Sequence, residues 1–167
     1  FKVKELLDAI APIGECNLVH EVSQQLPIFT LSEILGIPEQ DRQKLVSWME
    51  FLELAQYFTY EMIKEQNEGK TESTPDQSMV DMFNAMVDEM FEYGRFILKE
   101  KRKNPSNDLL SAIANAEIEG EKLTDEFLDG SWLLIIFAGN DTTRNTMSGG
   151  IKLLHENQNQ KEMLLKD

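Results

Sequence analysis

The stretch "LLIIFAGNDTTRN", Leu133 to Asn145, contains the residues on which the fold and the function of this chain depend most. It begins as an apolar run typical of a core helix, and then places the polar sequence "GNDTT" within two helical turns. A glycine inside a helix costs about 1 kcal/mol relative to alanine, and an aspartate in a core helix needs charged or hydrogen-bonding partners. Residues that break local rules in this way are typical of functional sites.

The residues around this stretch predict that it lies on one long helix. Thr124 has the side chain of an N-cap, and the two acidic residues after it complement the positive end of a helix dipole. A helix that runs from there to His155 is about 48 Å long at 1.5 Å per residue. Such a helix is unusually long for a globular protein.

The remainder of the chain shows the spacing of amphipathic helices. Apolar residues recur at intervals of three and four in the segments 3–10, 19–35, 45–52 and 79–97. A shorter helix is predicted over 108–117, and Gly120 allows a tight turn within a small hairpin. We therefore predict an all-α chain with one long central helix and little or no sheet.

We expect residues 1–167 to form part of a single domain. The polar segment from Glu65 to Gln77, "EQNEGKTESTPDQ", has no hydrophobic period and is predicted to be a loop. Neither side of it resembles a complete domain. Because Phe1 falls within one helical pattern and Asp167 ends another without a stop signal, both ends are expected to be truncated.

The composition disfavours several classes of protein. Thirty acidic residues against sixteen basic ones give a formal net charge of -14, which repels nucleic acids and anionic membranes. No apolar run approaches the roughly 20 residues of a spanning helix, and no signal peptide opens the chain. We expect a cytoplasmic protein that has no membrane anchor and binds no nucleic acid.

The central stretch also predicts a particular chemistry. Thr142 lies four residues after Ala138, so its hydroxyl can reach the Ala138 carbonyl oxygen. Gly139 allows a close approach to the backbone, and Asp141 beside Thr142 forms an acid and alcohol pair that can relay protons. A purely structural explanation stays open here, because threonines often bond to helix carbonyls and small residues often mark helix crossings.

The hexapeptide "AGNDTT", residues 138–143, resembles the motif on the long central helix of the cytochrome P450 family. That motif has Ala or Gly, then Gly, any residue, Asp or Glu, Thr, and Thr or Ser. The similarity extends over "CNLVHEVSQQLPIFTLSEILGIPEQDRQKL", 16–45, and over "DLLSAIANAEIEGEKLTDEFLDGSWLLIIFAG", 108–139. On these three pieces, in this order, the chain is identified as an internal fragment of a soluble, bacterial-type member of that family.

The resemblance implies a haem-thiolate monooxygenase that activates dioxygen and hydroxylates an apolar organic substrate. Asp141 and Thr142 would then be the catalytic residues that deliver protons. Ala138, Gly139 and Thr142 would lie against the haem.

The resemblance also implies partners and a substrate class. Leu134, Phe137 and Ala138 would face a small apolar substrate. Electrons would come from NAD(P)H through a ferredoxin and a ferredoxin reductase. The continuation "TTRN", 142–145, is similar to members that act on lipids, sterols and terpenes.

The iron ligand of the family is expected outside this chain. The family holds its iron with a cysteine in the pattern F-x-x-G-x-x-x-C-x-G, downstream of the central helix. Cys16 lies upstream and lacks the framing Phe and Gly residues, so we predict a packed cysteine and no metal ligand. The strings 39–42 and 92–95 have the family's Glu-x-x-Arg spacing but also precede the central helix, and neither is assigned as that pair.

A second hypothesis comes from another class of protein. Met79, Met82, Met86 and Met90 lie on one stripe of a predicted helix and could form an adaptable groove for a partner. The chain would then be a non-catalytic, acidic helical protein-interaction module. Packing is the commoner reason for such a stripe.

Overall fold

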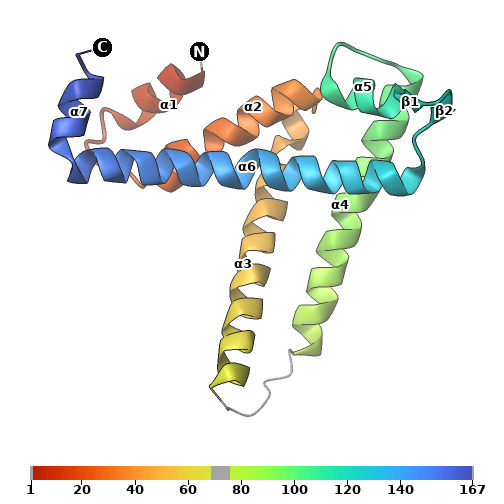
Figure 1. Ribbon diagram of the computed structural model, residues 1–167, viewed down its shortest axis with the longest axis horizontal. Helices are drawn as coiled ribbons and strands as arrows, with labels where there is room; N and C mark the ends of the chain where they lie inside the picture. Colours follow the sequence, from red (N-terminus) through yellow and green to blue (C-terminus); the bar gives the residue numbers. More distant parts are fainter. Residues whose placement is uncertain (1, 69–75, 167) are drawn as a thin grey trace. The chain divides into compact units, whose positions relative to one another are not determined.

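The computed structural model describes residues 2–68 and 76–166 and shows a chain built almost entirely of helices (Figure 1). The elements are α1 (Lys2–Ile10), the π-helical turn η1 (Val19–Ser23), α2 (Gln25–Leu35), the 3-10 turn η2 (Glu39–Asp41), α3 (Arg42–Asn67), α4 (Gln77–Lys103), α5 (Leu109–Asn115), β1 (Glu117–Ile118), β2 (Glu121–Lys122), α6 (Asp125–Glu156) and α7 (Gln158–Leu164). The predicted all-α class and the long central helix, α6, are confirmed. Within the described ranges, no helix is long and apolar enough to cross a bilayer.

The chain divides into two compact units. Unit 1 comprises Phe1–Ile34 and Ile135–Asp167, and unit 2 comprises Leu35–Leu134. The divisions fall within α2 and α6, so each unit contains part of both helices.

Several residues of the predicted polar loop, 65–77, belong to helices in the structure. Its residues 69–75 lie outside the described residues. Helix α3 continues to Asn67, because Glu65 and its neighbours are good helix formers. Helix α4 begins after Asp76, whose side chain accepts a hydrogen bond from the Ser78 amide at 3.0 Å. The first residues of the expected loop are therefore helical.

The helical segment predicted over 19–35 is divided at Gln24, just before Pro27. Pro27 lies in the first turn of α2, where its missing N–H removes no helix hydrogen bond. The preceding turn, η1, ends with the Gln24 amide donating to the Val19 carbonyl at 2.8 Å. One helical run was expected over 19–35, and the structure resolves it into a π-turn followed by an α-helix.

The core of unit 2 contains three aromatic rings from three helices. The Trp48 ring centroid lies 5.4 Å from that of Tyr93 and 6.4 Å from that of Trp132. The Trp132 Nε1 donates to the Met90 carbonyl oxygen at 3.0 Å. The Tyr93 hydroxyl donates to Asp41 at 3.0 Å, and burial together with that carboxylate raises the pKa of Tyr93. The cluster fixes α6 against α3 and α4 within this unit.

Gly94 is required by the close approach of Trp132. A Cβ at position 94 would lie 2.5 Å from Trp132 Cδ1 and 2.6 Å from its Nε1. We predict that Gly94→Ala lowers the free energy of unfolding by about 1–2 kcal/mol, since a buried indole must move. Urea unfolding of the full-length protein measures this change.

Gly130→Ala is the matched control for that substitution. Gly130 also lies inside a helix, but a Cβ there meets no atom within 4 Å. Its replacement is expected to raise stability by about 0.5–1 kcal/mol. Equal effects of the two substitutions would contradict the role given to Trp132.

The predicted hairpin is confirmed between α5 and α6. Glu117 pairs with Lys122 and Ile118 with Glu121, in antiparallel register. The two loop residues, Glu119 and Gly120, have φ of 55° and 85°, as a two-residue hairpin turn of the I′ type requires. Helix α5 ends at Asn115, two residues before the end expected at residue 117.

A mostly buried ion pair joins α4 to the start of α5. Lys101 Nζ lies 2.5 Å from Asp108 Oδ2, and the two side chains are 15% and 6% exposed. Asp108 is also the N-cap of α5 and accepts from the Ser111 amide at 2.7 Å. Burial alone would raise the pKa of Asp108, but the hydrogen bonds from Lys101, Ser106 and Ser111 outweigh it and lower that pKa to about 2.

Candidate functional site

The middle of α6 has one exposed and one buried face. The exposed face, called the exposed stripe below, is formed by residues three and four positions apart: Leu134, Ala138, Asp141, Thr142 and Asn145. Leu134 is 67% exposed, although it is a large apolar side chain in the interior of a long helix. The opposite face contains Leu128, Trp132, Ile136 and Asn140, all buried. The stripe therefore passes from apolar to polar within three helical turns.

The predicted bond from Thr142 to the helix backbone is confirmed. Thr142 Oγ1 donates to the Ala138 carbonyl oxygen at 2.9 Å, and Thr143 Oγ1 lies 3.5 Å from the Gly139 carbonyl oxygen. The hydroxyl hydrogen of Thr142 therefore points back along the helix. Its oxygen keeps acceptor capacity on the exposed stripe.

Asp141 is exposed, whereas its place in a core helix had suggested a buried carboxyl. Its side chain is 54% exposed. Oδ1 accepts hydrogen bonds from Arg144 Nη2 at 3.0 Å and from Asn145 Nδ2 at 2.9 Å. The sequence analysis missed both partners, although the i+3 and i+4 spacing of an arginine and an asparagine was a usable signal.

Gly139 permits the close approach that its sequence context predicted. A Cβ at this position would lie 2.9 Å from Leu31 Cδ1, and both residues belong to unit 1. The approaching group in the described chain is thus a leucine of α2. The expected contact of Gly139 with a cofactor stays a prediction.

The residues expected to face substrate lie on or beside the exposed stripe. Ala138 and Leu134 are exposed, and Phe137 is half-buried. The three lie within four residues of α6, so the helix brings them to adjoining positions.

Asn140 was not singled out by the sequence analysis. It is 1% exposed, and neither its Oδ1 nor its Nδ2 has a hydrogen-bond partner among the described residues. The polar sequence "GNDTT" thus contains one residue that faces inward and several that face outward.

Cys16 does not have the packed environment expected for it. It is a free cysteine and it is exposed, in the segment between α1 and η1. The described parts of the chain contain no group of three or more His, Cys, Asp or Glu side chains that could hold a metal ion. Arg95, which belongs to one of the two Glu-x-x-Arg strings, instead pairs with Asp129, with Nη2 2.6 Å from Oδ2.

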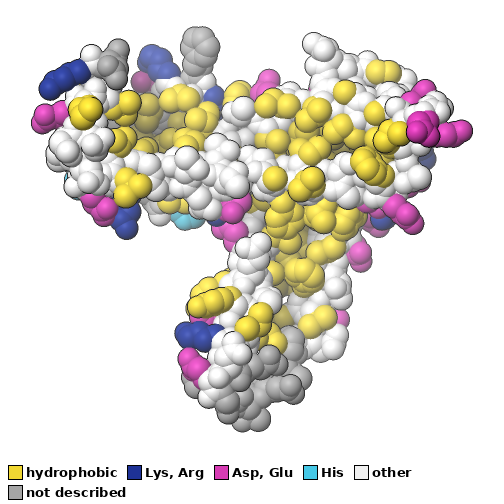
Figure 2. Space-filling view, viewed as in Figure 1, with side chains coloured by type: hydrophobic (Ala, Val, Ile, Leu, Met, Phe, Trp, Pro, Cys, Tyr) yellow, Lys and Arg dark blue, Asp and Glu magenta, His cyan; other side chains and the backbone are white. Residues whose placement is uncertain are grey.

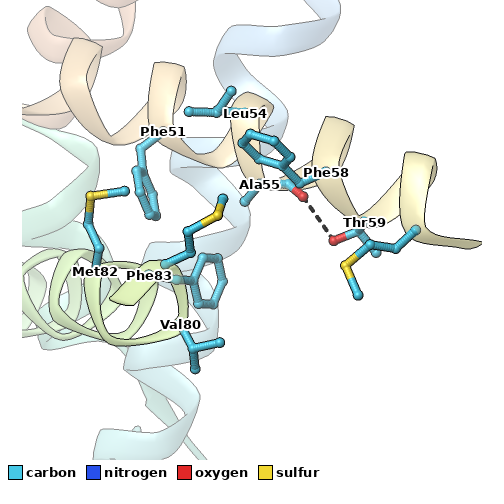
Figure 3. Close-up of a pocket in the computed structure, with 10 residues that line it drawn as sticks. Phe51, Leu54, Ala55, Phe58, Thr59, Val80, Met82 and Phe83 are labelled. Atoms are coloured by element: carbon cyan, nitrogen blue, oxygen red, sulfur yellow. Dashed lines mark hydrogen bonds between the residues drawn. The ribbon is translucent and has the colours of Figure 1, made fainter. Parts of the chain in front are cut away.

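An apolar groove lies between α3 and α4 in unit 2 (Figure 3). It has a volume of about 230 Å³ and is lined by Phe51, Leu54, Ala55, Phe58, Thr59, Met62, Met79, Val80, Met82 and Phe83. The Thr59 hydroxyl donates to the Ala55 carbonyl at 2.8 Å, as the dashed line shows. Figure 2 shows hydrophobic side chains exposed on this helix pair.

The methionine stripe of α4 is divided by this arrangement. Met90 is 2% exposed and packs in the core, as the packing explanation predicts. Met79 and Met82 are 37% and 52% exposed and line the groove. Packing therefore accounts for the second half of the stripe only.

Comparisons with known proteins match nearly the whole chain. The family model described as Cytochrome P450 matches residues 18–167. A steroid C26-monooxygenase of Mycobacterium tuberculosis (strain CDC 1551 / Oshkosh) is 30% identical over 162 residues, which cover 97% of this chain and 40% of that protein.

Solved structures give the same result. Mycobacterium marinum cytochrome P450 CYP268A2 in complex with pseudoionone has a TM-score of 0.76 and 30% identity, covering 99% of this chain and 37% of that one. CYP109E1 from Bacillus megaterium in complex with testosterone has a TM-score of 0.78 and 27% identity, covering 99% and 40%. The chain thus spans 37% to 40% of the length of these relatives.

Proposed function

Because this chain belongs to the cytochrome P450 family, we propose that it carries the oxygen-side helix of a haem-thiolate monooxygenase that hydroxylates an apolar substrate. The observation that supports this most directly is the exposed stripe of α6. It places an alanine, an acid and an alcohol on one face, at the positions where the family motif has them. Family membership favours this function over the non-catalytic interaction module.

The residues of the exposed stripe fit one side of a flat, apolar group. Ala138 offers a small side chain between Leu134 and Thr142, and a rigid ring system can approach a helix closely over such a residue. We propose that Ala138, Gly139 and Thr142 hold a haem on this side. When bound, haem supplies the activation of dioxygen, while the protein supplies orientation and protons.

Asp141 and Thr142 would move protons along the stripe. The Asp141 carboxyl is exposed and can exchange protons with water. Thr142 can accept a hydrogen bond on its oxygen, and it passes a proton on when its own hydrogen leaves the Ala138 carbonyl oxygen. The pair therefore has an acid that is open to solvent next to an alcohol that the helix holds in one orientation.

The substrate class we propose is a steroid or a terpenoid. One relative is named a steroid C26-monooxygenase, and one similar structure holds testosterone. In this chain, Leu134 and Phe137 supply apolar surface beside the stripe. Electrons would come from NAD(P)H through a ferredoxin and its reductase.

The test of this function uses the full-length protein loaded with haem. Addition of testosterone should change the optical spectrum of the haem, and turnover with NADH and redox partners should give a product that contains one added oxygen atom. A full-length protein that binds haem but neither responds to steroids and terpenoids nor oxygenates them would contradict the proposed substrate class.

Thr142→Ala should separate electron use from product formation. The substitution removes the hydroxyl that donates to the Ala138 carbonyl and leaves the stripe without its alcohol. We expect haem content and steroid affinity to stay the same, while product per NADH falls about tenfold and hydrogen peroxide rises. Thr143→Ala is the control, since its hydroxyl contact is longer, at 3.5 Å. Unchanged coupling in Thr142→Ala would remove the role assigned to this residue.

A further inference from the structure

The arginine that contacts Asp141 is itself mostly buried. The Arg144 side chain is 12% exposed, while the Asp141 side chain is 54% exposed. Ion pairs at i and i+3 on a helix surface are usually weak, because both side chains can move into water. Here the guanidinium cannot do so without losing its packing, so the arginine is the fixed member of the pair.

Arg144 and Asn145 both bind the same oxygen of Asp141. Nη2 of Arg144 donates to Oδ1 at 3.0 Å, and Nδ2 of Asn145 donates to it at 2.9 Å. Oδ2 receives no hydrogen bond from any described residue. The two carboxylate oxygens therefore differ, since two donors occupy the acceptor sites of one and leave the other open.

We propose that Arg144 is a positioning residue for Asp141. Arg144 holds Oδ1 of Asp141, so that Oδ2 is the oxygen that carries the proton. This inference rests on the proposed function of Asp141. In the step assigned to it, Oδ2 takes a proton from water and passes it to the Thr142 hydroxyl oxygen, while the Thr142 hydroxyl releases its own hydrogen, until then donated to the Ala138 carbonyl oxygen, to an acceptor on the exposed stripe. Arg144 keeps its protons throughout, because a guanidinium is not deprotonated in proteins.

The position of Arg144 on α6 suits this role. It lies one turn after Asp141 and stays outside the exposed stripe, since its side chain is mostly buried where those of Asp141 and Thr142 are exposed. Arg144 can therefore orient the acid without occupying the face where substrate or haem would lie.

The experiment replaces Arg144 in the full-length holoenzyme. Arg144→Met removes the donor and the charge but keeps an unbranched apolar stem. We expect a fall of about tenfold in product per NADH, and a displaced pH profile of product formation, because the oxygen that exchanges the proton is no longer held in place. Arg144→Lys, which keeps a charged donor, should restore much of the product per NADH and much of the original pH profile. If Arg144→Met does not bind haem, Arg144→Gln is measured with the same expectations.

Lys152→Met is the matched control on the same helix. Lys152 also pairs with an acid, Glu156 at 3.9 Å, but its side chain is 75% exposed. Its replacement should leave coupling and the pH profile unchanged. An Arg144→Met enzyme with the coupling and pH profile of the Lys152→Met enzyme would overturn the inference.

A double substitution distinguishes the inference from the proposed function. In an Asp141→Asn background, Arg144→Met should have no further effect, since the asparagine at position 141 has no carboxyl proton to deliver. Additive effects would mean that Arg144 acts independently of Asp141 and would overturn the positioning role. If Asp141→Asn alone changes nothing, the proposed proton relay fails. If Asp141→Asn slows turnover and Arg144→Met does not, only the positioning role fails.

Discussion

Asp141→Asn in the full-length protein is expected to slow product formation by about 10²–10⁴-fold, the usual contribution of general acid–base catalysis. Asparagine keeps an oxygen that can accept from Arg144 and Asn145, so the local geometry on α6 should survive. The exchangeable proton of the carboxyl is lost, together with the negative charge that pairs with Arg144. Single-turnover rates in normal and heavy water measure the effect, and the solvent isotope effect should increase.

Asp125→Asn supplies the same chemical change at the start of the same helix. Asp125 is 90% exposed and lies 3.7 Å from Arg102, far along α6 from the exposed stripe. Its replacement should leave the rate within about twofold, as is usual for surface substitutions. Equal rates for the Asp141→Asn and Asp125→Asn enzymes would show that Asp141 delivers no proton.

Asp108→Asn should produce the largest loss of stability among these substitutions. Asparagine can still cap α5, but Lys101 is left as a mostly buried cation that faces the neutral Ser106 hydroxyl and no carboxylate. Removal of one member of a buried pair costs about 3 kcal/mol or more. Asp76→Asn is the control, because Asp76 is an exposed N-cap of α4 and should lose well under 1 kcal/mol.

The same aspartate predicts a dependence of stability on pH. The pKa of Asp108 falls from 3.8 to about 2 in the folded chain. A lowered pKa stabilises the fold fully above pH 4, and this stabilisation is lost as the pH falls from about 4 to 2. Urea unfolding of the wild type between pH 7 and pH 2.5 should show this loss. In the Asp108→Asn protein, the free energy of unfolding should fall less steeply at acid pH. An equally steep fall in the free energy of unfolding for both proteins would contradict the assignment of this pH dependence to Asp108.

The sequence predicted those helices whose ends depend on local signals. Thr124 begins α6, with its hydroxyl accepting from the Phe127 amide at 3.3 Å. The turn at Gly120 was also placed correctly, because caps and positive-φ residues act on their own neighbours. The end of α5 was not placed correctly. Asn115 donates to the Lys101 carbonyl oxygen at 3.2 Å, and this contact with another helix is not visible in the local sequence.

The candidate site was predicted in part for the same reason. The bond from Thr142 to Ala138 is local and follows from a spacing of four. The neighbour of Gly139 is a leucine more than one hundred positions earlier in the chain, and no spacing rule within α6 could name it. The exposure of Asp141 likewise depends on which face of α6 the rest of unit 1 covers.

Gly36 shows how one contact can restrict sequence change at a distance. Its φ is +67°, and a Cβ there would collide with the Asp108 carboxylate and lie 2.7 Å from Lys101 Nζ. Gly14 and Gly120 share a positive φ but have open space around them, so asparagine is a tolerable replacement there. Position 36 has no such freedom while the ion pair exists. In evolving relatives, positions 36, 101 and 108 should therefore change together or not at all.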